Sequence, residues 1–447
     1  MKRRNAVKSL ISLPALSALG FSCLSYQKPA AGEEWKNGNF RKPIEGENDA
    51  QLLQKARQNI ESFRKGKLKI RIETKGKIIP NAEFEIVQLK HDFGFGFTQL
   101  GENTVKKLNE NQLKYLGNIF NTFTAKCYWN ERWHQPIEKV ENQRIYSVFE
   151  AEIDIAQRLG MTVKGHPLVW TVPKALPDWF RKYPYEMRLE KLLHHVEDMV
   201  GRYKGKVEIW DLCNEFLWEP SIRHTEERKW PHIETVEEIL SYLEPAIKTA
   251  RKANPNAKFV LNDYGLEKDY RTEISAKTQR NRYVELVREM KKRGIEPDAI
   301  GTQCHVAEPF TMAEIQNTLD DLSEAGTPVQ ITEFWASLNK KEVDEKTLAY
   351  IENAYTIGFG HKAMESFTYW GSDLILQNGD PGPKLKVLEK LIAKDWHTKA
   401  GFQTNLEGQF ETTAFYGTYS LIRAGKEVKK FQFERADAGN EVILKVD

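Results

Sequence analysis

The chain has 447 residues, 40% of them hydrophobic and 29% charged, which is enough apolar material for a large globular core. This composition excludes a disordered chain, a collagen-like chain and a small disulfide scaffold. The formal charge of +3 does not indicate an anionic partner, because segment 1–22 holds Lys2, Arg3, Arg4 and Lys8 and no acidic residue. The rest of the chain is close to neutral, so we expect no nucleic-acid partner.

Residues 1–22 have the layout of an export signal. Basic residues precede an apolar stretch at 10–21, which is too short to cross a bilayer as a helix. Arg3-Arg4 resembles a twin-arginine signal, and the four residues ending at Cys23 resemble an imperfect bacterial lipobox. We therefore expect a bacterial exported protein that is periplasmic, secreted or an outer-membrane lipoprotein. Two outcomes remain open: plain cleavage, or lipidation of Cys23.

After the export signal, residues 23–50 are rich in glycine, proline and charge and are predicted to be a tether. Residues 51–90 are predicted to form a helix and then a β-hairpin. In that hairpin, 67–73 alternates in polarity, Lys75-Gly76-Lys77 is the turn, and 84–86 resumes the alternation.

The C-terminal segment, 397–447, is predicted to be β structure. Its alternation runs from 409 to 433 around Gly417 and Gly425. We expect it to pack against the N-terminal hairpin, since a lone hairpin is marginal in water. Its aromatic residues are expected to serve that packing, with carbohydrate binding as the alternative. They are Phe410, Phe415, Tyr416 and Tyr419.

Between these ends, 91–396 repeats a short apolar run, a polar loop and a helical pattern. The apolar runs are 93–98, 119–129, 162–170, 207–215, 258–264, 299–306, 329–335 and 366–371. Eight such units over about 300 residues predict an α/β fold, an eight-stranded (β/α)8 TIM barrel with small flanking β segments. A doubly wound sheet is the rival, but no glycine-rich phosphate loop follows an early strand.

Two glutamates end strands of the predicted barrel. Glu215 closes the fourth strand and Glu333 the seventh, so they face each other across one mouth. Paired carboxyl groups of this kind can hydrolyse a glycosidic bond, one as proton donor and the other as nucleophile or base. A separation of about 5 Å predicts retention of configuration at the sugar.

Other residues at the strand ends fit a sugar better than a metal. Indole rings can cover the apolar face of a sugar, and amides and imidazoles can bind its hydroxyls. The indoles expected to line the mouth are Trp129, Trp170, Trp335 and Trp370. His166 and His305 lack the spacing of metal ligands, and Cys127, Cys213 and Cys304 are expected to be buried free thiols. We expect no metal and no cofactor.

Six motifs in chain order resemble glycoside hydrolase family 10, the retaining endo-β-1,4-xylanases, over about 300 residues. They are Gly165-His166-Pro167-Leu168-Val169-Trp170, Trp210-Asp211-Leu212-Cys213-Asn214-Glu215, Leu261-Asn262-Asp263-Tyr264, Gly301-Thr302-Gln303-Cys304-His305, Ile331-Thr332-Glu333 and Tyr369-Trp370-Gly371. The flanking β segments also resemble those of plant-type members.

The resemblance implies a role for each matching residue. Glu215 is expected to be the acid/base and Glu333 the nucleophile. Asn214 is expected to hold the sugar 2-hydroxyl, while Gln303 and His305 position the nucleophile. The remaining substrate-binding residues implied are His166, Trp170, Tyr264 and Trp370.

The second strand departs from the family pattern. The family usually shows Glu-Asn-x-x-Lys-Trp there, and this chain has Lys126, Trp129 and Asn130 in that stretch. Trp335 also stands where an aspartate usually follows the nucleophile. We therefore include Lys126, Asn130 and Trp335 as candidate substrate contacts. A lysine in place of a glutamate suggests an acidic or substituted sugar.

The sequence leaves three interpretations open. The first is a monomeric retaining glycoside hydrolase acting on xylan or a related, substituted plant polysaccharide. The second keeps this chemistry on another β-glycan. The third is a non-catalytic surface carbohydrate-binding protein on a barrel, which gives no reason to retain both Glu215 and Glu333.

Overall fold

The computed structural model describes residues 46, 48–98, 108–130, 135–219, 222–223, 233–269, 274–305, 310–336, 343–371, 373–376 and 378–446. All of them belong to one compact unit, Asn39–Asp447. The predicted export signal, the candidate lipidation site Cys23 and most of the predicted tether lie outside the described residues. In the described part of the chain, no helix is both long enough and apolar enough to cross a membrane.

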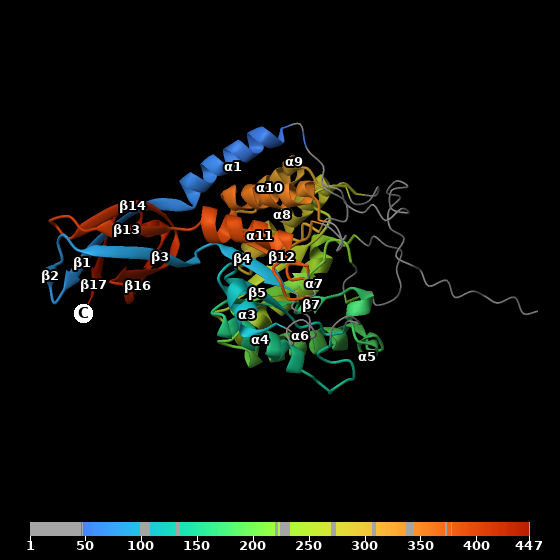
Figure 1. Ribbon diagram of the computed structural model, residues 1–447. Helices are drawn as coiled ribbons and strands as arrows, with labels where there is room; N and C mark the ends of the chain where they lie inside the picture. Colours follow the sequence, from blue (N-terminus) through green and yellow to red (C-terminus); the bar gives the residue numbers. More distant parts are fainter. Residues whose placement is uncertain are drawn as a thin grey trace, which may run out of the picture. The chain divides into compact units, whose positions relative to one another are not determined.

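Parallel strands close into a barrel at the centre of this unit (Figure 1). Its eight strands, within the described ranges, are β4 (Gly94–Thr98), β5 (Thr122–Lys126), β6 (Thr162–His166), β8 (Ile209–Asn214), β9 (Lys258–Asp263), β10 (Ala299–Thr302), β11 (Val329–Phe334) and β12 (Met364–Trp370). Strand β12 pairs in parallel with β4, which joins the last strand to the first. The predicted fold class, a (β/α)8 barrel, is confirmed.

Two of the predicted strands differ in detail. The third is interrupted after His166, and a two-residue strand, β7 (Val169–Trp170), then pairs with the end of β8. The sixth ends at Thr302, so Gln303 and His305 lie on the segment that leaves the strand. Both departures occur at the carboxyl ends of strands, where the backbone turns outward into loops.

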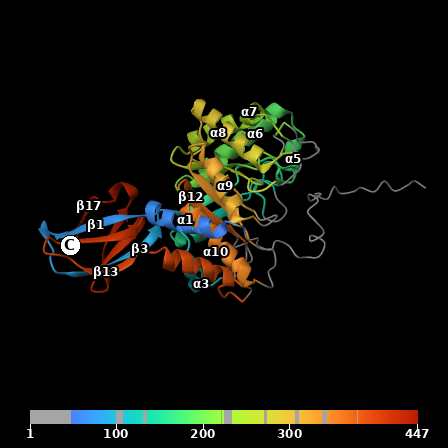
Figure 2. The same ribbon diagram turned by 90° about the horizontal axis from the view of Figure 1, so that it is seen from above.

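Helices cover the outside of the barrel, as Figures 1 and 2 show. They are α3 (Glu110–Gly117), α4 (Ser147–Arg158), α5 (Asp178–Arg181), α6 (Tyr185–Arg202), α7 (Val236–Ala253), α8 (Ala276–Lys292), α9 (Met312–Ser323), α10 (Glu345–Gly360) and α11 (Pro383–Leu388). Several begin at a reciprocal cap: Thr235 Oγ1 accepts from the Glu238 backbone, and Glu238 caps Thr235 in return. Each cap satisfies backbone N–H groups that a helix start leaves open.

Strands from both ends of the chain form a second hydrophobic cluster, here called the β-module. Its strands are β1 (Lys65–Thr74), β2 (Lys77–Ile78), β3 (Glu83–His91), β13 (Lys399–Gln403), β14 (Gln409–Phe415), β15 (Gly417–Arg423), β16 (Lys426–Phe433) and β17 (Glu441–Lys445). Phe415, Tyr416 and Tyr419 are buried, as the packing interpretation expects, and Phe410 stacks on Phe402.

The predicted N-terminal hairpin is confirmed in its first strand and its turn and is wrong in its second strand. Strand β1 turns back at Lys75 and Gly76 into the two residues of β2, and its main partners are β14 and β17. Strand β3, which contains the predicted second strand 84–86, belongs to the other sheet, between β13 and β15.

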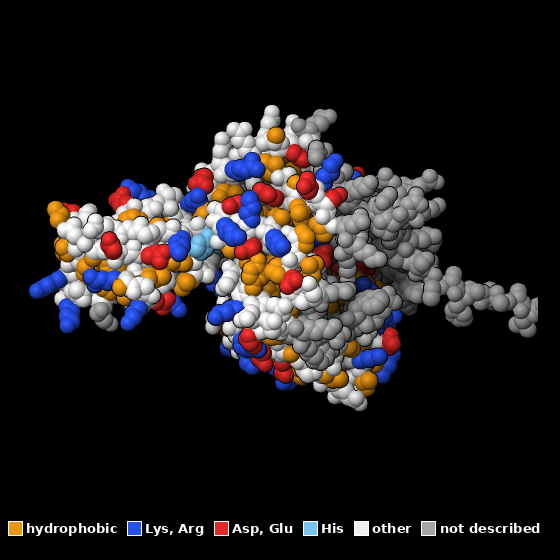
Figure 3. Space-filling model, viewed as in Figure 1, with side chains coloured by type: hydrophobic (Ala, Val, Ile, Leu, Met, Phe, Trp, Pro, Cys, Tyr) orange, Lys and Arg blue, Asp and Glu red, His pale blue; other side chains and the backbone are white. Residues whose placement is uncertain are grey.

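Surface charges are mixed in sign. Figure 3 shows lysine and arginine side chains interspersed with aspartate and glutamate over the visible face. Several are paired across strands, as in Lys67 with Glu411 and Lys399 with Glu85. The face in view therefore carries no extended patch of one sign.

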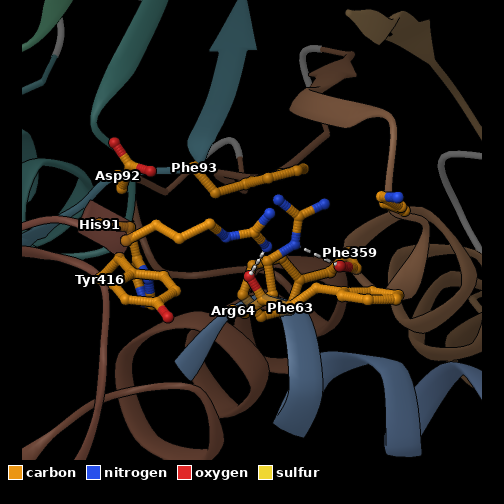
Figure 4. A pocket seen from close by; sticks show the side chains of 9 residues that line it. Phe63, Arg64, His91, Asp92, Phe93, Phe359 and Tyr416 are labelled. Carbon is orange, nitrogen blue, oxygen red and sulfur yellow. Dashed lines mark hydrogen bonds between the residues drawn. The ribbon is translucent and has the colours of Figure 1, made fainter. Parts of the chain in front are cut away.

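Arg64 joins the end of α1 (Asp49–Phe63) to the end of α10, beside which α1 lies in both ribbon views. Its Nε donates to the Phe359 carbonyl at 2.7 Å, and its Nη2 donates to those of His361 and Met364 at 2.7 and 2.8 Å. The guanidinium also lies over the Phe93 ring, 4.7 Å from its centroid. Figure 4 shows Arg64, Phe93 and Phe359 along a pocket of about 260 Å³. Carbonyl groups at a helix end favour a cation.

Replacing Arg64 by methionine should lower the free energy of unfolding by about 3 kcal/mol, because three carbonyl groups lose their donor. Denaturant unfolding followed by circular dichroism measures this. Arg57→Met, on the exposed side of the same helix, is the control and should change stability by less than about 0.5 kcal/mol. Equal effects of the two substitutions would contradict the bridging role of Arg64.

Candidate active site

Glu215 and Glu333 lie at the carboxyl ends of β8 and β11. The backbone N–H of Glu215 donates to the Asn262 carbonyl at 2.9 Å, and that of Glu333 donates to the Gln303 carbonyl at 3.1 Å. Glu215 has a φ of +63°, a left-handed conformation that is unfavourable for a residue with a side chain. Strain of this kind is concentrated at functional sites.

The Glu215 carboxyl group accepts two hydrogen bonds. Trp170 Nε1 donates to its Oε2 at 2.7 Å, and Gln303 Nε2 donates to its Oε1 at 3.1 Å. Burial raises the pKa of Glu215 above its ordinary value of 4.5, and the charge of Glu333 adds to the rise. The two hydrogen bonds and the charge of Lys174 oppose this rise without cancelling it. Glu215 is therefore the group of the pair that keeps its proton to the higher pH.

Glu333 is 4% exposed and is surrounded by donors. Asn262 Nδ2 donates to its Oε1 at 2.8 Å, and His305 Nε2 lies 2.8 Å from its Oε2. His166 Nε2 lies 3.9 Å from Oε1. Burial alone would raise the pKa of Glu333, but the hydrogen bond from His305 and the nearby imidazoles outweigh it and lower the pKa. Glu333 is therefore the ionised member of the pair.

An amide network connects the two glutamates. Asn262 Nδ2, besides its bond to Glu333, donates to Asn214 Oδ1 at 2.9 Å. Gln303 Nε2 lies within 3.3 Å of the same Asn214 oxygen and also donates to Glu215. Thr332 Oγ1 donates to Asn262 Oδ1 at 2.6 Å, which fixes the orientation of that amide. The hydrogen bonds therefore run without a break from one carboxyl group to the other.

A buried ion pair holds His166 in place. Asp211 Oδ2 lies 2.8 Å from His166 Nδ1, and Asp211 Oδ1 lies 2.8 Å from Lys164 Nζ. The bond at Nδ1 directs Nε2 of the same ring toward Glu333. Burial raises the pKa of Asp211, but Lys164 and His166 reverse that effect and lower it, so Asp211 stays ionised.

Aromatic rings surround the network. Trp370 meets His166 and His305 edge-on, with ring centroids 5.1 and 6.1 Å apart, and Trp335 packs against the outer side of His305 at 6.3 Å. Tyr264 lies further out, where its hydroxyl donates to Glu219 at 3.2 Å. Partly exposed aromatic faces beside buried polar groups suit a sugar ring.

Trp129 does not line the mouth, contrary to expectation. It is 5% exposed and stacks on His195, with ring centroids 4.4 Å apart, and it also packs against Phe180. Its Nε1 donates to Glu138 at 3.1 Å. The indole points into the layer between strands and helices, so it belongs to the core.

The two candidates from the second strand have different surroundings. Lys126, the last residue of β5, is 6% exposed and pairs in register with His166. Its Nζ lies 5.7 Å from the centroid of the Trp370 ring. Asn130 instead donates from Nδ2 to the carbonyls of Lys174 and Leu176, each at 3.3 Å, and so supports the loop after β7.

Sequence analysis did not assign a site role to three residues that the structure places next to the glutamates. Asn262 and Asp211 belong to the family motifs, where Asn262 precedes Asp263 and Asp211 lies four residues before Glu215. Lys174 follows Trp170 in a loop without any recognisable pattern, yet its charge acts on Glu215. For Asn262 and Asp211, the signal in the sequence was a polar residue near the end of a strand, on the side of the strand that faces inward.

The arrangement provides, in the same mouth, one carboxyl group with a raised pKa and one with a lowered pKa. In the described ranges, no three or more residues among His, Cys, Asp and Glu are grouped as they would be to hold a metal ion. A proton donor beside an oriented carboxylate can assist the departure of an alcohol and stabilise or attack the positive centre left behind.

Comparison with known proteins agrees with this geometry. The model of glycosyl hydrolase family 10 matches residues 88–373, more than half of the chain. The chain belongs to glycosyl hydrolase family 10. Its barrel also resembles solved structures, among them GH10 from Paenibacillus barcinonensis and xylanase 10B from Thermotoga maritima. Both have TM-scores of 0.54, with 21% and 22% identity, and cover 69% and 68% of this chain and 96% of theirs.

Three curated relatives show the range of similarity. Anti-sigma-I factor RsgI6 of Acetivibrio thermocellus is 25% identical over 402 residues, 86% of this chain and 48% of its own. Endo-1,4-beta-xylanase A of Caldicellulosiruptor is 29% identical over 51% of this chain and 33% of its own. Beta-1,4-xylanase of Dictyoglomus thermophilum is 34% identical over 42% and 49%. The chain thus spans half or less of the length of these relatives.

Carboxyl titrations should show opposite shifts at the two glutamates. Carbon-13 NMR of glutamate-labelled protein should find that Glu215 titrates above 4.5 and Glu333 below it. Glu333→Gln removes a neighbouring negative charge and should lower the pKa of Glu215. Trp170→Phe removes a donor to the carboxylate and should raise it. Titration of both groups near 4.5, or in the reverse order, would refute the assignment of protonation states.

Proposed function

We propose that this protein is a retaining glycoside hydrolase that cleaves β-1,4-xylosidic bonds in xylan or a related plant polysaccharide by double displacement. The observation that carries the proposal is a pair of glutamates in one mouth, linked through Asn262, Asn214 and Gln303, whose surroundings shift the pKa of Glu215 up and that of Glu333 down. The xylanases among its relatives support the choice of substrate.

In the first step, a Glu333 oxygen attacks the anomeric carbon while Glu215 gives its proton to the departing glycosidic oxygen. The bond to the leaving sugar breaks and an ester between the sugar and Glu333 forms. His305 and Asn262 each hold one oxygen of Glu333, so the carboxylate is oriented before substrate arrives. Asn214 is placed between the two carboxyl groups, where it can bind the 2-hydroxyl.

The second step reverses the role of Glu215. Ester formation removes the negative charge of Glu333, and that charge is one of the causes that raise the pKa of Glu215. The pKa of Glu215 therefore falls when the ester forms, which favours the deprotonated group that now takes a proton from water. Water attacks the anomeric carbon, the ester bond breaks, and Glu333 returns to its ionised state.

Proton NMR of freshly cleaved xylo-oligosaccharide tests the mechanism. The first product should have the β configuration, the configuration of the bond that was cut, before mutarotation. Glu333→Gln and Glu215→Gln should each lower kcat/KM on xylan by about 10³-fold or more. An α product would contradict double displacement.

A panel of polysaccharides, scored by released reducing ends, decides between the substrates. Activity confined to another β-glycan would replace xylan and keep the chemistry. Binding without activity on any member of the panel would favour a carbohydrate-binding protein. Activity that survives in both glutamine variants would overturn the assignment of the pair.

We also propose that the protein is exported as a monomer and anchored through a lipid at Cys23. The support is the run of basic residues, apolar stretch and cysteine at 2–23. Cells fed with labelled palmitate should label the full chain in the membrane fraction. Cys23→Ser should abolish the label and release the protein. Membrane label that persists in Cys23→Ser would contradict lipidation at this residue.

A further inference from the structure

Lys126 places a positively charged side chain at the end of a barrel strand, beside the ring of Trp370. It ends β5 next to His166, and its Nζ lies 5.7 Å from the Trp370 ring centroid. Trp370 in turn packs against both His166 and His305, and His305 binds Glu333. The ammonium group and the imidazoles that hold the nucleophile therefore contact the same aromatic ring.

The surroundings of Lys126 do not neutralise it. Among the described residues, no carboxylate oxygen lies within 4.0 Å of its Nζ. Glu152, on α4, accepts from the backbone N–H of Lys126 at 2.8 Å, and its charge acts on the ammonium from beyond ion-pair distance. The side chain is 6% exposed. A nearly buried ammonium without an adjacent carboxylate loses hydration that an anionic ligand can restore.

The Glu333 carboxylate is too well satisfied to be the partner. Both of its oxygens already have donors at 2.8 Å, from Asn262 and His305. Burial lowers the pKa of Lys126, and the charges of Glu152 and Glu333 oppose that effect from a distance. Without a carboxylate within 4.0 Å among the described residues, the Nζ group keeps its hydrogen-bond donors for a ligand lying beside Trp370.

We infer that Lys126 selects a substrate that bears a carboxylate, a β-glycan substituted with uronic acid, and binds that carboxylate beside the sugar packed on Trp370. Sugar hydroxyls are also acceptable partners for an ammonium, but a carboxylate forms the stronger, charge-assisted hydrogen bond. This inference rests on the proposed function, because it assigns a substrate class to the same mouth.

The test compares two xylo-oligosaccharides of equal length, one neutral and one carrying a single glucuronic acid. The wild-type protein should show kcat/KM about tenfold higher for the acidic chain, an advantage that shrinks with added salt. Lys126→Met should bring the ratio of the two kcat/KM values close to one. Lys126→Arg should restore the advantage, and Lys126→Glu should invert it by repulsion.

Lys191→Met is the matched control. It also removes one positive charge and one lysine beside an indole, since Lys191 Nζ lies 5.6 Å from the Trp179 ring centroid. Its described partners, Glu141 and Tyr183, do not touch either catalytic glutamate. This control should leave the ratio between the two substrates unchanged. A ratio that falls equally in both variants would assign the effect to net charge.

The outcomes separate this inference from the proposed function. Wild-type activity on both chains at equal kcat/KM would overturn the inference alone. Equal loss of activity on both chains in Lys126→Met, with the acidic limb of the pH profile displaced, would also overturn the inference. Lys126 would then act as a counter-charge for Glu333. Absence of wild-type activity on both chains would overturn the proposed function.

Discussion

Repulsion between two buried carboxyl groups governs the site of this barrel. Burial raises the pKa of any carboxyl group, and a second charge in the same mouth raises it further. Each carboxyl group receives one donor per oxygen, but the donors differ in kind: those of Glu333 are an amide and an imidazole, with a second imidazole nearby, whereas those of Glu215 are an indole and an amide. Other residues of the site maintain this difference between the two carboxyl groups. Asp211, paired with Lys164, orients His166 toward Glu333.

The fold was predictable because its evidence is local. A parallel strand covered on both faces appears as a continuous apolar run, and a polar residue that ends such a run is conspicuous. Glu215 and Glu333 were found in this way. The main partners of β1 were not predictable, since they come from the other end of the chain, as in the pairing of Ile70 with Phe410. A local turn signal contains no information about such a partner.

The direction of side chains at the strand ends was the second feature that could not be predicted from the sequence. A residue at the end of a strand faces the mouth or the helices according to a register of one residue. Trp129 took the second direction and stacks on His195. Asn262, next to Asp263 in the sequence, faces inward and binds Glu333, while Asp263 accepts from the Leu217 backbone. The residue types at the strand ends indicated the chemistry of the mouth, but only the structure shows which of these residues contact one another.

The central claim is that Glu333 is a nucleophile and not a base. A xyloside with fluorine at carbon 2 and a good leaving group slows hydrolysis of the ester more than its formation, so the intermediate accumulates. Mass spectrometry of peptides from the treated protein should find the fluoro-sugar attached to Glu333, with no label in Glu333→Gln. A label on Glu215 or another residue, or turnover of the reagent without any labelled peptide, would contradict the account.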